Sequence, residues 1–223
     1  MKKWNKKLLL EDGTQYYGYG FGSQEETITE LVFNTAPVGY QEILSDPSYT
    51  YQTVVMAYPL IGNYGIAKED FETKKPTIGG LAVRDYNDLP SNFRSIGTLD
   101  EVMKRYHIPG ISGIDTRKLV RKIRDYGSCK VLLTDADTPL AEGMKKLAGY
   151  EIPKDAVSKV SSKEIRICAA KQEKYLVAAI DCGMKENIIR SLNARGCSVM
   201  VYPWNTSYEE IQKQNPDGVF LSN

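Results

Sequence analysis

Nucleophilic catalysis in this chain could draw on four cysteines and one histidine. The cysteines are residues 129, 168, 182 and 197, and the histidine is His107. No two cysteines form a C-x-x-C pair, and zinc sites and disulfide frameworks need closer or paired spacing. We therefore expect buried free thiols. His107 stands where the pattern predicts a helix end, next to Pro109, which disfavours a catalytic role for it.

Two loops have the composition of a ligand-binding or partner-binding surface. They run from Phe33 to Tyr49 and from Tyr58 to Gly65, and both are rich in Asn, Gly, Tyr and Pro. Such loops can hold polar groups in fixed positions on a scaffold. The first contains Ser48, whose hydroxyl can both donate and accept hydrogen bonds. From the pattern alone, a pair of capped turns explains the loops equally well, and a turn serine is the simpler interpretation of Ser48.

The composition is that of an ordinary soluble globular protein. The 223 residues include 42% hydrophobic and 26% charged residues, and the formal net charge is +1. This balance gives no electrostatic reason to expect binding to nucleic acid or to an anionic membrane. The basic start is followed by only three leucines, Leu8 to Leu10, too few for a signal peptide, and no apolar run approaches the roughly 18–20 residues of a membrane span. We expect a cytoplasmic protein.

The chain is predicted to form an α/β protein with two domains, residues 1–152 and 175–223, joined by a polar linker, 153–174. The first domain mixes strands and helices. Its predicted strands are 7–10, 30–33, 53–57 and 81–83, and its predicted helices are 98–106, 115–126 and 138–147. Thr98 and Glu101 have the spacing of a capping box, Asp115 is a predicted N-cap, and Pro139 is predicted at the first position of its helix.

The second domain alternates strand and helix. Strands are predicted at 176–180, 198–202 and 219–221, and helices at 184–195 and from about 206 to 214. This β-α-β-α-β order is typical of the first part of a doubly wound parallel sheet, in which chemistry lies beyond the carboxyl ends of the strands. Because the sequence stops just after its third strand, we expect the wall of an active site without most of its contents, and an exposed sheet edge.

Five blocks in order carry a resemblance to one family. They are the two polar loops and the segments Pro109–Arg121, Asp181–Ile188 and Pro216–Asn223. Together they resemble the small, glutamine-hydrolysing chain of carbamoyl-phosphate synthetase, truncated within its class I glutamine amidotransferase domain. The sequence departs from the family at Ala36-Pro-Val38, where Ser-Met-Thr is common, and at Glu186, where Arg is usual.

The resemblance implies a glutaminase reaction that feeds a second subunit. In the family a cysteine thiolate attacks the amide of L-glutamine with help from His and Glu, and ammonia passes to a large subunit. The large subunit combines it with bicarbonate and ATP, using Mg, to give carbamoyl phosphate for pyrimidine and arginine biosynthesis. The family's nucleophile, base and oxyanion hole lie after the last residue of this sequence. The resemblance therefore implies no catalytic residue, no metal ligand and no cofactor on this chain, which by itself should be inactive.

One functional position carries over by resemblance. Ser48, in Asp46-Pro-Ser-Tyr49, matches the serine with which the family's first domain contacts the bound glutamine. Cys182 follows a strand near a helix start, where a thiol pKa can fall, but the matching family position is usually Phe, so a packing role is favoured.

One helix face has two interpretations within this assignment, and two other functions compete with the assignment itself. Arg117, Arg121 and Arg124 lie on one face of their predicted helix, which is either a solvated face or a docking surface for the large subunit. The chain could also be a non-catalytic docking or regulatory protein that retains the fold. Asp181 as a receiver-type phosphoacceptor is disfavoured, because the acidic pair and the late lysine that this chemistry needs are not seen.

Overall fold

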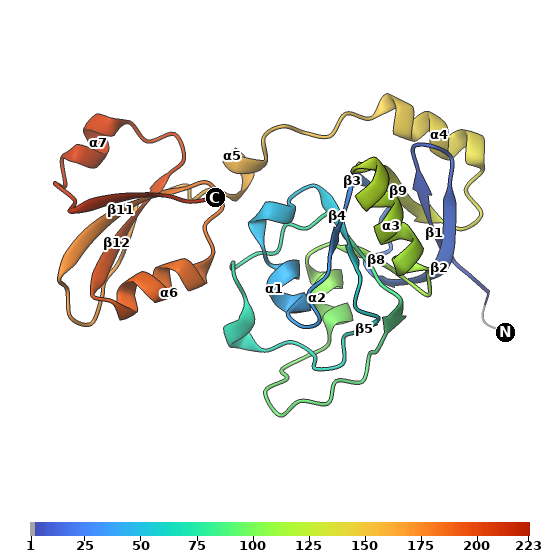
Figure 1. The fold of residues 1–223 in the computed structure, drawn as a ribbon, viewed down its shortest axis with the longest axis horizontal. Helices are drawn as coiled ribbons and strands as arrows, with labels where there is room; N and C mark the ends of the chain where they lie inside the picture. The colour runs from blue at the N-terminus through green and yellow to red at the C-terminus, as the bar shows by residue number, and fades with distance from the viewer. Residues whose placement is uncertain (1–2) are drawn as a thin grey trace. The chain divides into compact units, whose positions relative to one another are not determined.

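The computed structural model describes residues 3–223, which form two compact units (Figure 1). The first unit comprises the residues up to Phe71 and Lys75–Pro153. The second comprises Glu72–Lys74 and Lys154–Asn223. Among the described residues, no helix combines the length and the apolar character that crossing a bilayer requires.

The first unit is built on a closed barrel of seven strands, in the order β1-β2-β8-β6-β4-β3-β9. The barrel strands pair in parallel from β3 through β4 and β6 to β8, and antiparallel elsewhere. Its elements are β1 (Lys6–Leu10), β2 (Gln15–Gly22), β3 (Thr27–Asn34), α1 (Tyr40–Leu44), the 3-10 helix η1 (Pro47–Tyr49), β4 (Gln52–Met56), β5 (Leu60–Ile61), the 3-10 helix η2 (Lys68–Asp70), β6 (Gly80–Ala82), β7 (Asp85–Tyr86), α2 (Leu99–Arg105), β8 (Pro109–Ser112), α3 (Thr116–Tyr126), β9 (Cys129–Asp135) and α4 (Leu140–Gly149).

Alternation along the barrel strands separates the apolar side chains into an inner and an outer set. All seven strands contribute to one buried cluster, which includes Leu8 and Leu10 of β1, and α3 packs against it through Leu119 and Ile123. Leu9, between the two leucines, packs outward against α4. The outer faces of β4 and β6 are covered by α1 and α2. Burial on both faces explains why β1 is an uninterrupted hydrophobic run at Leu8–Leu10.

The predicted helix starts are confirmed in two of three cases. Thr98 and Glu101 form the capping box of α2, and the Asp115 carboxylate accepts a hydrogen bond from Lys118 N at 3.0 Å at the start of α3. The third prediction is wrong by one residue. Pro139 has extended backbone angles and is the N-cap of α4, so the helix begins at Leu140.

Strand β2 was not expected from the sequence because it contains three glycines. At Gly18 a glycine is required because β2 and β8 approach each other closely. A Cβ atom on Gly18 would lie 2.2 Å from the carbonyl oxygen of Ser112 on β8. Glycine, which usually indicates a turn, here permits close strand packing.

The second unit contains a four-stranded sheet in the order β10-β12-β11-β13. Strands β11 and β12, and β11 and β13, are parallel, as the β-α-β-α-β prediction requires. Strand β10 pairs antiparallel with β12 and comes from the stretch predicted to be a linker. The elements are α5 (Ala156–Val160), β10 (Arg166–Cys168), β11 (Tyr175–Asp181), α6 (Glu186–Ala194), β12 (Cys197–Pro203), α7 (Tyr208–Gln212) and β13 (Gly218–Leu221).

The two longer strands of this sheet are covered on both faces. Ile188, Ile189 and Leu192 of α6 pack on one face, whereas Ile211 of α7 packs on the other (Figure 1). Strand β13 is different, because its side chains at Val219 and Leu221 are 61% and 70% exposed. This exposed apolar edge agrees with the expectation from the sequence.

Candidate functional site

Ser48 lies in the 3-10 helix η1, on the surface of the first unit. The Asp46 carboxylate, at the N-cap of η1, accepts a hydrogen bond from Ser48 N at 3.0 Å. The hydroxyl of Thr50 donates to Pro47 O at 2.7 Å and closes the other end of the turn. Within residues 3–223 the exposed Ser48 hydroxyl makes no hydrogen bond. It is therefore held by its backbone and open to a ligand.

The loop that carries Ser48 is tied to the end of β3. Asn34, the last residue of β3, donates from Nδ2 to the Tyr49 hydroxyl at 3.0 Å and accepts from Ala36 N at 2.7 Å. In the segment Ala36-Pro-Val38, where the sequence departs from the family, Ala36 is half-buried against the core that α1 covers, whereas Pro37 and Val38 are exposed, Val38 by 71%. The departure thus changes an exposed surface at Pro37 and Val38 and a core contact at Ala36, while the backbone of Ala36 still donates to Asn34.

The two polar loops predicted from the sequence contact each other. Tyr64, in the second loop, accepts hydrogen bonds from the backbone of the first, and its ring stacks on Tyr40 with 4.0 Å between centroids. Gln41, which is completely buried, exchanges two hydrogen bonds with the backbone of Ala67. Ser48 therefore stands on a platform built from both loops.

In the second unit, the carboxyl ends of β11 and β12 are crossed by Ser161 and Ser162. Asp181, the last residue of β11, accepts four hydrogen bonds. They come from Gly183 N and Met184 N on one oxygen, and from the amide and hydroxyl of Ser162 on the other. Ser161 Oγ accepts from Trp204 N at 2.9 Å. A carboxylate saturated in this way shapes the turn after β11, and this argues against a phosphoacceptor role for Asp181.

The pKa of Asp181 reflects two opposing effects. Burial raises it, but the hydrogen bonds from Met184, Ser162 and Gly183 outweigh burial and bring it below the ordinary value of 3.8. Ionised Asp181 therefore stabilises the folded unit fully above pH 3.8. This contribution is lost as the pH falls through the lower pKa of the folded state.

We expect Asp181→Asn to destabilise the second unit at pH 7 by about 1–3 kcal/mol, because an amide nitrogen cannot accept from Ser162. The substitution should also flatten the loss of stability as the pH falls below 3.8. Urea unfolding at several pH values, followed by tryptophan fluorescence, to which Trp204 contributes from the second unit and Trp4 from the first, would measure both effects. Glu164→Gln, at an exposed carboxylate of the same unit, is the matched control. Identical acid profiles for wild type and Asp181→Asn would contradict the assignment.

The cysteines are free, as predicted, but each is half-buried rather than fully buried. Burial raises the pKa of Cys129 to about 11, which leaves its thiol protonated at neutral pH. Cys182 donates its backbone N–H to Ser222 Oγ at 2.8 Å. His107 is exposed, and its Nδ1 lies 2.6 Å from Glu25 Oε1, so the histidine is paired with a carboxylate and not with a thiol.

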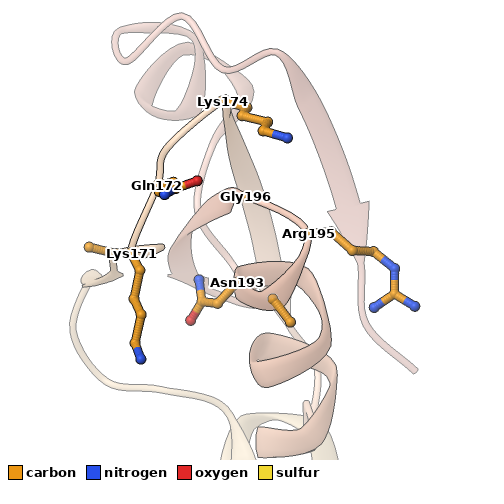
Figure 2. A pocket seen from close by; sticks show the side chains of 8 residues that line it. Lys171, Gln172, Lys174, Asn193, Arg195 and Gly196 are labelled. Atoms are coloured by element: carbon orange, nitrogen blue, oxygen red, sulfur yellow. The ribbon is translucent and has the colours of Figure 1, made fainter.

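A pocket of about 640 Å³ in the second unit lies at the wrong edge of the sheet for catalysis (Figure 2). Lys174 and Gly196, which line it, immediately precede β11 and β12, whereas sites in parallel sheets form at the carboxyl ends. Figure 2 shows the side chains of Lys171, Lys174 and Arg195 pointing in different directions. They do not converge on a position that an anion could occupy.

The three arginines predicted on one helical face are exposed on α3. Arg124 is paired with Asp125 at 2.8 Å, while the opposite face of α3 is buried through Leu119 and Ile123. This arrangement suits both a solvated face and a docking surface, so the two alternatives from the sequence remain open.

Two family models match the chain, in the order of its two units. Residues 8–133 match the family described as carbamoyl-phosphate synthase small chain, CPSase domain, which covers more than half of the sequence. The chain belongs to the carbamoyl-phosphate synthase small-chain family. Residues 178–223 of this small-chain family member match the class I glutamine amidotransferase family. The family assignment made from sequence motifs is thereby confirmed.

Curated relatives in this small-chain family span nearly the whole sequence. The carbamoyl phosphate synthase small chain of Staphylococcus epidermidis is 49% identical over 97% of this chain and 58% of its own length. That of Fusobacterium nucleatum is 49% identical over 99% of this chain and 61% of its own length. The pyrimidine-specific small chain of Bacillus subtilis is 46% identical, over 98% and 59%. The chain thus spans about three-fifths of the length of these relatives.

Sequence reasoning identified the two polar loops but missed the contacts between them. Tyr64 and Tyr40 are 24 residues apart, and no local pattern pairs them. It also missed the partner of Asp181, because Ser162 lies in the stretch that was predicted to be a linker. The only sequence signal for the tyrosine pair was the enrichment of both loops in tyrosine.

Proposed function

We propose that this chain belongs to the small component of a glutamine-dependent carbamoyl-phosphate synthase. The observation that supports this most directly is that the small-chain domain and a class I amidotransferase segment follow each other in one sequence, as their family matches at residues 8–133 and 178–223 indicate. In the whole protein, glutamine is hydrolysed and the ammonia is used by a large chain to make carbamoyl phosphate from bicarbonate and ATP.

This proposal divides the reaction between the small chain and the large chain. In this proposal ATP and Mg are used by the large chain. A cytoplasmic location and a role in pyrimidine or arginine biosynthesis are part of the same proposal, and the pyrimidine-specific names of two relatives support the first pathway. The test is to assemble the full-length small chain with its large chain and to measure glutamine-dependent formation of carbamoyl phosphate. Stable assembly without turnover would favour the docking or regulatory alternative.

We further propose that the Ser48 hydroxyl contacts the substrate glutamine. Its support is the exposed, unengaged hydroxyl on a turn whose backbone is fixed by Asp46 and Thr50. We expect Ser48→Ala to raise the KM for glutamine about 10-fold, the effect of losing one hydrogen bond to a polar ligand group. Synthesis from added ammonia should not change, because ammonia bypasses glutamine binding.

Ser91→Ala is a suitable control, since it removes an exposed hydroxyl in another loop of the same unit. Steady-state kinetics with glutamine and with ammonium chloride would measure both activities. An unchanged KM for glutamine in Ser48→Ala would exclude this contact, even if the holoenzyme is otherwise active.

A further inference from the structure

The hydroxyl of Tyr64 takes the place of a helix cap on α1. The N-cap residue of α1 is Gly39, which has a φ of 89° and no side chain to accept from the first backbone N–H groups. Tyr64 OH lies 3.0 Å from Gly39 N and 2.9 Å from Tyr40 N, and both amides donate to it. A residue in the second polar loop therefore accepts from the N-cap and first-position amides of α1, two of the backbone donors that have no acceptor within the helix.

Tyr40, in the first polar loop, in turn donates a hydrogen bond to the second loop. Its hydroxyl, which is fully buried, donates to Gly65 O at 2.7 Å, next to Tyr64 in the sequence. The two rings are stacked with an interplanar angle of 19°. Burial raises the pKa of both tyrosines, so both phenols stay protonated at neutral pH. Each loop thus holds the other through one ring stack and three hydrogen bonds.

This attachment is continuous with the turn that carries Ser48. The side-chain amide of Gln41 in α1 donates a hydrogen bond to Ala67 O and accepts one from Ala67 N. The Ser45 hydroxyl donates to the backbone oxygen of Gln41 at 2.9 Å. Asp46 follows directly and accepts from Ser48 N. Hydrogen bonds thus connect α1 to the turn that carries Ser48, and we expect a shift of α1 to move Ser48.

We propose that Tyr64 is a positioning residue for glutamine recognition, which acts by capping α1 and thereby holding the Ser48 hydroxyl at the place where the substrate is bound. The proposal rests on the proposed function of Ser48 and deepens it. It concerns a contact between two loops, and Tyr64 itself does not touch the substrate.

The test uses Tyr64→Phe in the full-length small chain assembled with its large chain. Phenylalanine keeps the aromatic ring and removes only the hydroxyl group, which accepts from Gly39 N and Tyr40 N. We expect the KM for glutamine to rise about 10-fold with little change in kcat, because misplacement of a binding group weakens substrate binding. Ammonia-dependent synthesis should be unchanged. Tyr58→Phe, in the same loop but outside this hydrogen-bond network, is the matched control.

Amide hydrogen exchange on the 223-residue chain gives an independent measure. In Tyr64→Phe the amides of Gly39 and Tyr40 should exchange about 10-fold faster or more, since they lose their acceptor, whereas those of barrel strand β9 should not change. Faster exchange over the whole unit would indicate general destabilisation and would overturn a specific positioning role.

The kinetic outcomes separate the two proposals. A wild-type holoenzyme without glutamine turnover would refute the proposed function itself. With an active wild type, an unchanged KM in Tyr64→Phe would overturn the positioning role and leave the proposed function intact. A fall in kcat for both glutamine and ammonia at constant KM would mean that less protein is folded, and would also overturn it.

Discussion

The 223-residue chain by itself should release no ammonia from L-glutamine. A class I reaction needs a thiolate with a base beside it, and the chain contains one histidine, His107. That histidine is exposed and paired with Glu25. The second unit, which holds Cys168, Cys182 and Cys197, contains no histidine at all. Cys129 lies in the first unit, where burial raises its pKa to about 11.

An ammonia assay coupled to glutamate dehydrogenase would test this expectation on folded chain. The expected signal equals that of a buffer blank at any glutamine concentration. A full-length relative with its large chain is the positive control, and Cys182→Ala is the diagnostic variant. Ammonia release that disappears in Cys182→Ala would identify Cys182 as a nucleophile and contradict the packing role assigned to it.

Gly62→Ala should destabilise the first unit by about 2–5 kcal/mol. Gly62 has a φ of 96°, and a left-handed backbone costs an L-residue about 1–2 kcal/mol. A Cβ atom there would also lie 2.2 Å from the carbonyl oxygen of Asn87. That carbonyl cannot move easily, because Asn87 N donates to Ile61 O at 2.8 Å in the ladder between β5 and β7. Overpacking of this kind adds about 1–3 kcal/mol.

Gly13→Ala separates the cost of the left-handed backbone from the cost of the steric clash. Gly13 has a similar φ of 84°, but a Cβ atom there would have nothing within 4 Å. It should therefore show only the backbone cost of about 1–2 kcal/mol. Urea denaturation of both variants would give the difference between them, which measures the clash. Equal losses for the two variants would show that the loop at Gly62 adjusts freely.

The position of Gly62 links stability to the candidate site. It lies at the start of the segment that carries Tyr64 and Ala67, the two residues that hold α1. A loop displaced by a clash at Gly62 would therefore disturb the platform under Ser48 as well as the barrel. Tyr64→Phe perturbs that platform without adding atoms, so the two variants distinguish crowding from the loss of a cap.

The sequence was sufficient for the parallel β-α-β-α-β order of the second unit and for the family. Its strands are short, continuous apolar runs, and its helices end at glycine or begin at polar caps, so the signals are local. The family assignment depended on ordered motifs, and these can be read without any knowledge of contacts. Ser48 came from such a motif, and its role remains a proposal.

The tertiary structure decided the closure of the barrel. Strand β2 contains Gly18, Gly20 and Gly22 and does not resemble a strand locally. Gly18 is explained only by the approach of β8, where a side chain would collide with the backbone of Ser112. Strand β10 was hidden in the same way, because three residues in a polar stretch become a strand only when β12 lies beside them.

The candidate site likewise has features that the sequence predicted and contacts that only the tertiary structure shows. The sequence marked both polar loops and the Ser48 turn, because Asp46 and Pro47 are turn residues that act on their immediate neighbours. Only the tertiary structure placed the Tyr64 hydroxyl on α1 and the Ser162 hydroxyl on Asp181. Both contacts join residues far apart in the chain, and their energy is realised only once the strands between them have fixed the geometry.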